Sequence, residues 1–169
     1  MERMKFLNNL LLNITVAIID FIYRDLPIQR FWVLETIARA PYFAFLSVLH
    51  LRESLGLRTE AHYYLMKEHF AQTLNETEHL IEMEHRGGAD RWVDRFFAYH
   101  LVLIYYWILV GYYFIAPVSA YHLNAGIEFH ATETYLNYLW EHDYDKKVAE
   151  IAVDEMNHYI ELSRAMEMI

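Results

Sequence analysis

The sequence contains no cysteine and few of the residues that make tight turns. The lack of cysteine among its 169 residues excludes disulfides, thiolate chemistry and iron–sulfur clusters. Five glycines and three prolines leave little room for the many turns of an all-β fold. Basic residues number 14 against 23 acidic ones, and a formal net charge of −9 argues against a nucleic-acid partner, which requires a basic face. These shortages favour a helical protein that does not bind nucleic acid.

Apolar side chains are abundant instead. They make up 56% of the chain and aromatic residues 17%, which is high for a soluble protein, and the length suits one domain. The hydrophobic periodicity predicts six helices within a single all-α domain spanning residues 1–169. We expect these helices near residues 4–23, 28–55, 59–86, 91–115, 117–142 and 145–166.

Local signals set the predicted boundaries. The pair Gly87-Gly88 ends the third helix, Asp90 is expected to cap the fourth, and Pro117 opens the fifth. Asp145 precedes the sixth helix. Pro41 falls inside the second helix, where we expect a kink.

Two Glu-x-x-His pairs suggest a metal site. Glu76 and His79 lie three residues apart, hence on one face of a helix, and Glu155 and His158 repeat this spacing. Two such helices, with one further glutamate from each of two others, describe the carboxylate-bridged di-iron site of a four-helix bundle. Carboxylates and imidazoles are suitable ligands for iron, and Glu35 and Glu128 are candidates for the remaining positions.

A single Glu-x-x-His motif is a weak signal in a chain rich in both residues. A third pair, Glu82 and His85, begins six residues after Glu76, about 240° around a helix, so the two pairs cannot face the same core. For either motif alone, a solvated helix face is the simpler interpretation. Four glutamates on otherwise apolar bundle helices are a stronger signal, because their burial without metal would be very costly.

The apolar segments also raise the question of a membrane. Residues 96–127 contain no charged side chain and are long enough to cross a bilayer. A full crossing would place His79 and Glu128 on opposite sides, so they could not share one metal site. A buried core helix is the alternative. We favour helices 4–23 and 91–115 lying in one leaflet, as two amphipathic helices added to the bundle.

Several segments resemble the alternative oxidases, particularly their plastid terminal oxidase branch. The resemblance covers roughly residues 19–160, although residues 136–154 are abbreviated and diverged. The matching segments are YRDLPIQRFWVLETIARAPYFAF (23–45), SVLH (47–50), NETEHL (75–80), SAYH (119–122), EFHATETY (128–135) and DEMNH (154–158).

The resemblance implies a monotopic, ferritin-like enzyme with two iron ions and no haem, which oxidises quinol and reduces O₂ to water without pumping protons. It also implies a homodimer on a thylakoid or bacterial cytoplasmic membrane. The branch favours plastoquinol, but the sequence does not exclude ubiquinol. The family's metal ligands fall on Glu35, Glu76, His79, Glu128, Glu155 and His158.

Further roles follow from the same resemblance. Tyr135 matches a tyrosine beside the metals, and it lies seven residues after Glu128, on the same helix face. Asp154 and Asn75 match groups that orient the ligands. The expected quinol pocket contains Arg30, Leu34, His130, Ala131 and Thr134, and His50 and Tyr113 match positions needed for activity. Without the resemblance, simpler roles would be expected for three of these residues. Arg30 would be exposed to solvent, Tyr135 would pack in the core, and Asp154 would cap a helix or be solvated. We assign the remaining candidate histidines to the surface, namely His62, His69, His85 and His142.

Two other functions share the same bundle. A di-iron hydroxylase acting on a lipid or a quinone would place oxygen from O₂ in its product. A non-enzymatic ferritin-like membrane protein would bind iron without quinol turnover.

Overall fold

The computed structural model describes residues 2–169, and this part of the chain forms six α-helices and no strand. The boundaries lie within three residues of those expected from the periodicity. The helices are α1 (Glu2–Ile22), α2 (Pro27–Ser54), α3 (His62–His85), α4 (Trp92–Ile115), α5 (Pro117–Glu141) and α6 (Lys146–Glu167). Met1, included in the predicted domain, lies outside the described residues.

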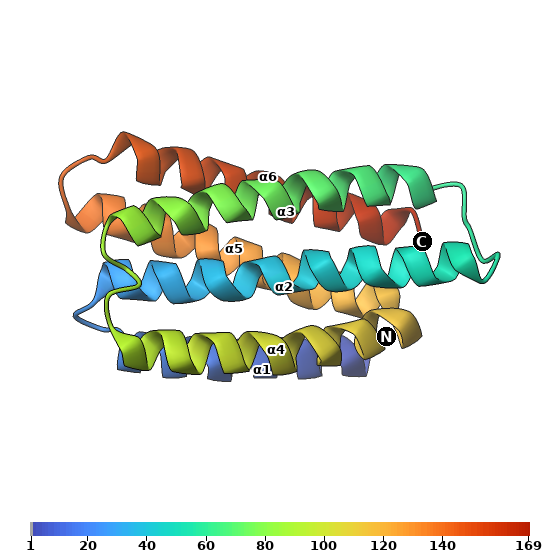
Figure 1. Ribbon diagram of the computed structural model, residues 1–169, viewed down its shortest axis with the longest axis horizontal. Helices are drawn as coiled ribbons and strands as arrows, with labels where there is room; N and C mark the ends of the chain where they lie inside the picture. The colour runs from blue at the N-terminus through green and yellow to red at the C-terminus, as the bar shows by residue number, and fades with distance from the viewer. Residues whose placement is uncertain (1) are drawn as a thin grey trace.

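The helices form two layers of three (Figure 1). In one layer α2 packs between α3 and α4, and in the other α5 packs between α6 and α1. The bundle formed by α2, α3, α5 and α6 therefore has α1 and α4 along one side. The fold is the expected all-α bundle with two additional helices.

The connections between helices follow local chemistry, with one exception. Gly87 has φ +83°, a left-handed conformation that favours glycine, and it follows Arg86, the C-cap residue of α3. The Asp145 side chain caps α6 by accepting hydrogen bonds from the backbone N–H groups of residues 147 and 148. The expected cap by Asp90 is wrong: Arg91 occupies that position of α4 without a side-chain cap, and the Asp90 N–H donates to the Gly87 carbonyl within the turn. α2 continues through the buried Pro41.

The apolar core is divided into two main clusters at opposite ends of the bundle. One contains Phe31, Trp32 and Met83, from the beginning of α2 and the end of α3. The other contains Phe45 and Leu65, from the end of α2 and the beginning of α3. Between the two ends, each of the four bundle helices carries a buried glutamate. The hydrophobic core therefore encloses a charged layer at mid-length.

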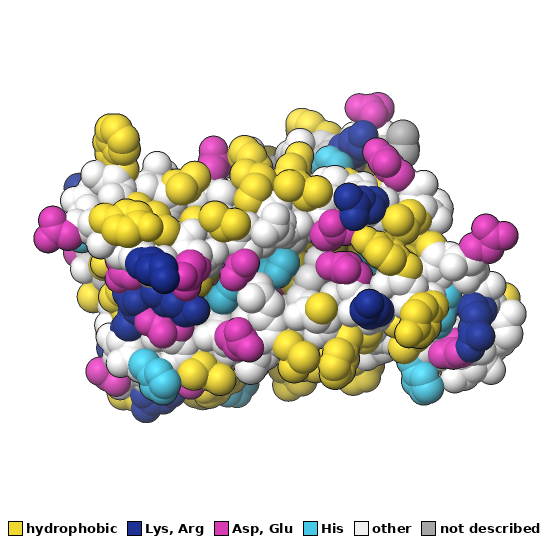
Figure 2. Space-filling model, turned by 90° about the horizontal axis from the view of Figure 1, so that it is seen from above, with side chains coloured by type: hydrophobic (Ala, Val, Ile, Leu, Met, Phe, Trp, Pro, Cys, Tyr) yellow, Lys and Arg dark blue, Asp and Glu magenta, His cyan; other side chains and the backbone are white. Residues whose placement is uncertain are grey.

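The outer helices are apolar and largely uncovered. Within the described residues, three helices are long and apolar enough to cross a membrane: α1, α2 and α4. α2 is mostly buried within the protein, whereas the apolar windows of α1 and α4 are only 6% and 17% buried. Figure 2 views the opposite side, formed by α3 and α6, where acidic and basic side chains are mixed with apolar ones. The molecule thus has one largely apolar side, formed by α1 and α4, and an opposite side on which charged and apolar side chains are mixed.

Candidate metal centre

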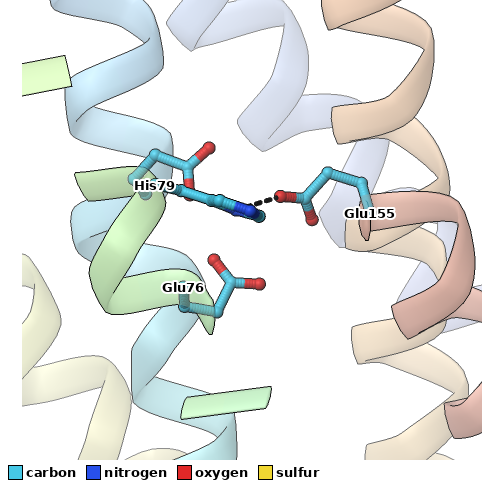
Figure 3. Close-up of side chains that lie close together, drawn as sticks. Glu76, His79 and Glu155 are labelled. Atoms are coloured by element: carbon cyan, nitrogen blue, oxygen red, sulfur yellow. Dashed lines mark hydrogen bonds and ion pairs between the residues drawn. The ribbon is translucent and has the colours of Figure 1, made fainter. Parts of the chain in front are cut away.

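Six buried side chains from four helices converge at the middle of the bundle. Figure 3 shows Glu76 and His79 of α3 facing Glu155 of α6. The potential ligand atoms form two groups, and within each group all lie within 4.8 Å of one another. The first group is Glu35, Glu76, His79 and Glu155, and the second is Glu76, Glu128, Glu155 and His158. Because Glu76 and Glu155 belong to both, the arrangement suits two ions bridged by these carboxylates.

The carboxylate oxygens of this cluster are poorly satisfied by the protein itself. Within residues 2–169, the Oε2 atoms of Glu35, Glu76, Glu128 and Glu155 are buried without a hydrogen-bond partner. Glu76 Oε1 likewise accepts no hydrogen bond and has only an ion-pair contact with His158 Nδ1. Burying an unpaired carboxylate oxygen is costly, and four negative charges in one apolar core repel each other. Two divalent cations would neutralise these charges and supply partners for the free oxygens. The residues present therefore fit a two-metal site.

The two histidines partly compensate the carboxylates when no metal is bound. His79 Nδ1 lies 3.0 Å from Glu155 Oε1, and His158 Nδ1 lies 2.9 Å from Glu76 Oε1. Burial alone would lower the pKa of His79, but hydrogen bonds to Glu155 and Glu35 outweigh it and raise the pKa to about 12. Burial, together with the Glu155 charge, raises the pKa of Glu76 to about 8. Protons on His79 and Glu76 thus partly neutralise the charge of the cluster, as a bound metal ion would.

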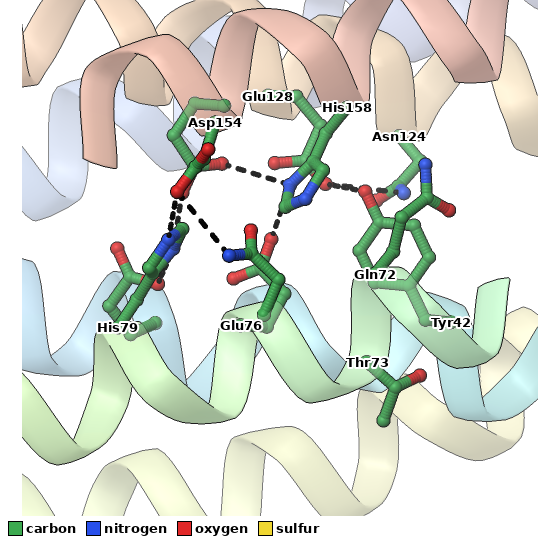
Figure 4. Close-up of polar contacts among 12 residues, drawn as sticks. Tyr42, Gln72, Thr73, Glu76, His79, Asn124, Glu128, Asp154 and His158 are labelled. Carbon is green, nitrogen blue, oxygen red and sulfur yellow. Dashed lines mark hydrogen bonds and ion pairs between the residues drawn. The ribbon is translucent and has the colours of Figure 1, made fainter. Parts of the chain in front are cut away.

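Tyr135 and Asp154 each contact a candidate ligand side chain, whereas Asn75 contacts Asp154 and no ligand in the hydrogen bonds of the described residues. The Tyr135 hydroxyl donates a hydrogen bond to Glu35 Oε1. Asp154 Oδ2 lies 3.2 Å from His79 Nε2 (Figure 4). The same oxygen accepts a hydrogen bond of 3.3 Å from Asn75 Nδ2. Contacts of this kind fix a histidine ring and its tautomer.

Three of the five residues expected to bind quinol line one cavity. Arg30, His130 and Thr134 line a cavity of about 460 Å³ between α1, α2 and α5. Arg30 Nη2 lies 3.2 Å from Thr134 Oγ1 and 2.6 Å from an Asp20 carboxylate oxygen. Among the described residues, neither Leu34 nor Ala131 lines this cavity.

Neither of the two positions expected to be needed for activity belongs to the ligand groups of the described residues. His50 is exposed near the end of α2. Tyr113 is buried, and its hydroxyl lies 2.7 Å from that of Tyr121, which in turn lies 2.7 Å from His69 Nε2. Their roles stay predictions.

Two of the four histidines assigned to the surface are in fact buried. His62 packs near Glu53, and His69 is held by Gln72 and Tyr121. Burial lowers the pKa of His69 to about 4, so its neutral ring fits the apolar interior. The sequence alone could not identify these two histidines as buried, because the buried face of α3 contains polar as well as apolar residues. His85 and His142 are exposed, as expected.

Three residues at the site escaped the sequence analysis. The Tyr42 hydroxyl donates a hydrogen bond of 2.8 Å to Glu128 Oε1, and Asn124 Nδ2 lies 3.4 Å from the same oxygen. Phe31 lines the cavity and stacks on Tyr135, with ring centroids 4.3 Å apart. Helical spacing could have found Phe31 and Tyr42. Phe31 lies four residues before Glu35 and Tyr42 seven after it, on the same face of α2.

Comparison with known proteins agrees with this geometry. The family model described as alternative oxidase matches residues 12–168. A curated relative, ubiquinol oxidase 4, chloroplastic/chromoplastic, from Arabidopsis thaliana, is 47% identical over 132 residues, which is 78% of this chain and 37% of the relative. The chain therefore spans little more than a third of that relative's length. No solved structure gives a significant match. The extent of the family match shows that the chain belongs to the alternative oxidase family.

Proposed function

We propose that the chain is a quinol oxidase, in which two quinols are oxidised to quinones while one O₂ is reduced to two water molecules. The observation that carries the proposal is the pair of overlapping ligand groups, joined by Glu76 and Glu155 at the centre of the bundle. Family membership and the name of the plant relative support the choice of quinol as the electron donor. Between the two candidate quinols, we favour plastoquinol over ubiquinol.

The six converging side chains would hold two iron ions. Glu35 and His79 belong to one group only, Glu128 and His158 to the other, and Glu76 and Glu155 would bridge. Iron would supply the redox chemistry with O₂ that carboxylates and imidazoles lack. The protein supplies a buried, water-poor pocket and fixed ligand positions. Four carboxylates and two divalent ions would leave the site neutral, as a buried site requires.

We place the quinol ring in the cavity beside Arg30. The Arg30 guanidinium and the Thr134 hydroxyl can hydrogen-bond quinol oxygens, and His130 lies 3.4 Å from Thr134 Oγ1. Phe31 forms part of the cavity wall and stacks on Tyr135, whose hydroxyl contacts Glu35. A ring at this position would be separated from the metal ligands by two aromatic side chains. Tyr135 would thus lie between the quinol and Glu35, positioned to relay an electron and its proton.

The uncovered helices support a monotopic attachment to a thylakoid or bacterial cytoplasmic membrane. α1 and α4 lie on the same side and run along the length of the bundle (Figure 1). If they crossed a bilayer, the bundle, whose other side carries charged residues, would have to enter it as well (Figure 2). Lying parallel to the surface in one leaflet buries their apolar residues without this cost.

A second apolar surface supports a homodimer. The exposed side chains on α3 recur at spacings of seven, four and seven residues, a stripe typical of a helix that packs on another helix. The stripe consists of Tyr63, Phe70, Leu74 and Ile81. A homodimer formed through α3 would cover it. Phe70→Glu should then yield monomers by light scattering, and an unchanged mass would exclude this surface.

Oxygen uptake by purified, iron-loaded protein tests the proposed activity. We expect consumption of one O₂ for two plastoquinols, lower rates with ubiquinol, and no activity in Glu76→Ala. With ¹⁸O₂ all label should appear in water, whereas a hydroxylase would place it in the organic product. Iron binding without quinol-dependent uptake would favour the ferritin-like alternative and contradict the proposal.

A further inference from the structure

α2 and α5 carry the same pattern of glutamate and tyrosine. Tyr42 follows Glu35 by seven residues on α2, and Tyr135 follows Glu128 by seven on α5. Seven residues are close to two helical turns, so each tyrosine shares a face with its glutamate. In the structure each hydroxyl reaches the glutamate of the other helix: Tyr135 donates to Glu35, and Tyr42 donates to Glu128.

This crossed pairing gives the centre an approximate twofold symmetry. The Glu-x-x-His pairs of α3 and α6 correspond in the same way, and each of the two ligand groups contains one of the pair Glu35 and Glu128. Tyr135 thus contacts the first group and Tyr42 the second. The family resemblance implies a tyrosine beside the metals only at position 135. In the structure, each group has a tyrosine hydroxyl on the glutamate that the other group does not share, Glu35 or Glu128.

Among the described residues, the Tyr42 hydroxyl has one hydrogen-bond partner, Glu128. Its side chain is fully buried, and its ring packs near His158 and His69, with centroids 5.7 and 6.0 Å away. The hydroxyl lies 2.8 Å from Glu128 Oε1, and an ionised carboxylate can only accept (Figure 4). Oε1 is also approached by Asn124, while Glu128 Oε2 has no partner within the described chain.

We infer that Tyr42 is a positioning residue for the second metal, which holds Glu128 by Oε1 and leaves Oε2 to bind the ion. The inference rests on the proposed two-metal site. A ligand held in this way needs no reorganisation when the metal binds. A hydrogen bond to a carboxylate also withdraws electron density from it, so Glu128 donates less charge to the metal. Tyr42 therefore stabilises the ferrous state relative to the ferric one.

Tyr42→Phe tests this role, because it removes only the hydroxyl. In the protein loaded with two irons, we expect a more negative midpoint potential, altered ferrous bands in magnetic circular dichroism, and about tenfold weaker binding of one ferrous ion. Tyr64→Phe is the matched control. It removes a tyrosine–carboxylate hydrogen bond of 2.6 Å to Glu161, outside the metal groups, and should leave all three readouts unchanged.

A second variant keeps the test decisive if Tyr42→Phe does not fold. Replacing Tyr42 with 3-fluorotyrosine retains the ring and hydroxyl but strengthens the hydrogen-bond donor, so the midpoint potential should become more positive. An unchanged potential in either folded, iron-loaded variant would overturn the inference. Failure of the unsubstituted protein to hold two irons would instead refute the two-metal site itself, so the two failures are distinguishable.

Discussion

The Tyr135 hydroxyl donates a hydrogen bond to Glu35, while the Tyr135 ring stacks on Phe31 at the wall of the cavity beside Arg30. One side chain thus contacts both the metal cluster and the lining of the proposed quinol site. Burial, followed by the charge of Glu35, raises the pKa of Tyr135 well above its ordinary value, so the hydroxyl remains a donor.

Tyr135→Phe should separate iron binding from turnover. The variant leaves a buried carboxylate oxygen unpaired, which should lower the free energy of unfolding by about 1–3 kcal/mol. We expect the iron content to stay near that of the unsubstituted protein while kcat for quinol oxidation falls at least about tenfold. Iron analysis and oxygen uptake on the same preparation measure both, with Tyr64→Phe as control. Full kcat in Tyr135→Phe would exclude any relay through this hydroxyl.

Asp154→Asn should weaken metal binding. Asp154 Oδ2 lies 3.2 Å from His79 Nε2, and a neutral amide cannot stabilise the ring as a carboxylate does. We expect the affinity for divalent metal to fall about 10–100-fold. Titration with Mn²⁺ measures this without redox side reactions. Asp143→Asn, at an exposed position in the loop before α6, is the control. Equal affinities in the two variants would contradict a positioning role for Asp154.

Metal binding should depend strongly on pH. In the metal-free protein, the pKa of Glu76 is about 8 and that of His79 about 12, so both groups hold protons at neutral pH. A bound ion must displace these protons. Affinity should therefore fall as pH decreases, by about tenfold per pH unit for each proton released, and the Glu76 proton should add to this dependence below about pH 8. Calorimetry of Mn²⁺ binding in buffers of different ionisation enthalpy counts the protons. Binding without proton release would contradict the assignment of protons to Glu76 and His79.

Gly88 should be sensitive to a single added methyl group. A Cβ there would lie 2.6 Å from Trp32 Cβ and 2.8 Å from the Met83 carbonyl oxygen, where the turn after α3 meets α2. Gly88→Ala should therefore cost about 1–3 kcal/mol of stability and lower Tm. Gly111→Ala is the matched control, because a Cβ there meets no atom within 4 Å, and it should stabilise α4 by up to about 1 kcal/mol. If Gly88→Ala and Gly111→Ala had equal Tm values, the turn after α3 would be able to shift around the added methyl group, and the prediction would be wrong.

The fold could be predicted because its signals are periodic and local. The apolar repeat gave six helices within three residues of their ends, and Gly87 marked the end of α3. The convergence of Glu76 with Glu155 was also accessible, because the Glu-x-x-His spacing fixes which side chains share a face. The Asp90 cap failed because Asp90 donates its N–H to the turn at Gly87 and lies one residue before the cap position.

Contacts between helices were less predictable from sequence. Spacing places Tyr42 on the face of Glu35, but only the antiparallel packing of α2 and α5 brings it to Glu128. Leu34 and Ala131 were assigned to the quinol pocket by resemblance alone, and the side-chain packing leaves both outside the cavity wall. The burial of His69 likewise depends on Tyr121, a partner 52 residues away.

The location of iron in crystals of the loaded protein tests the central claim most directly. Anomalous scattering at the iron edge should show two sites per chain, roughly 3.5–4 Å apart. Both should lie between Glu76 and Glu155, with Glu35 beside one ion and Glu128 beside the other. A single site, or iron bound elsewhere, would contradict the assignment of this cluster as a di-iron centre.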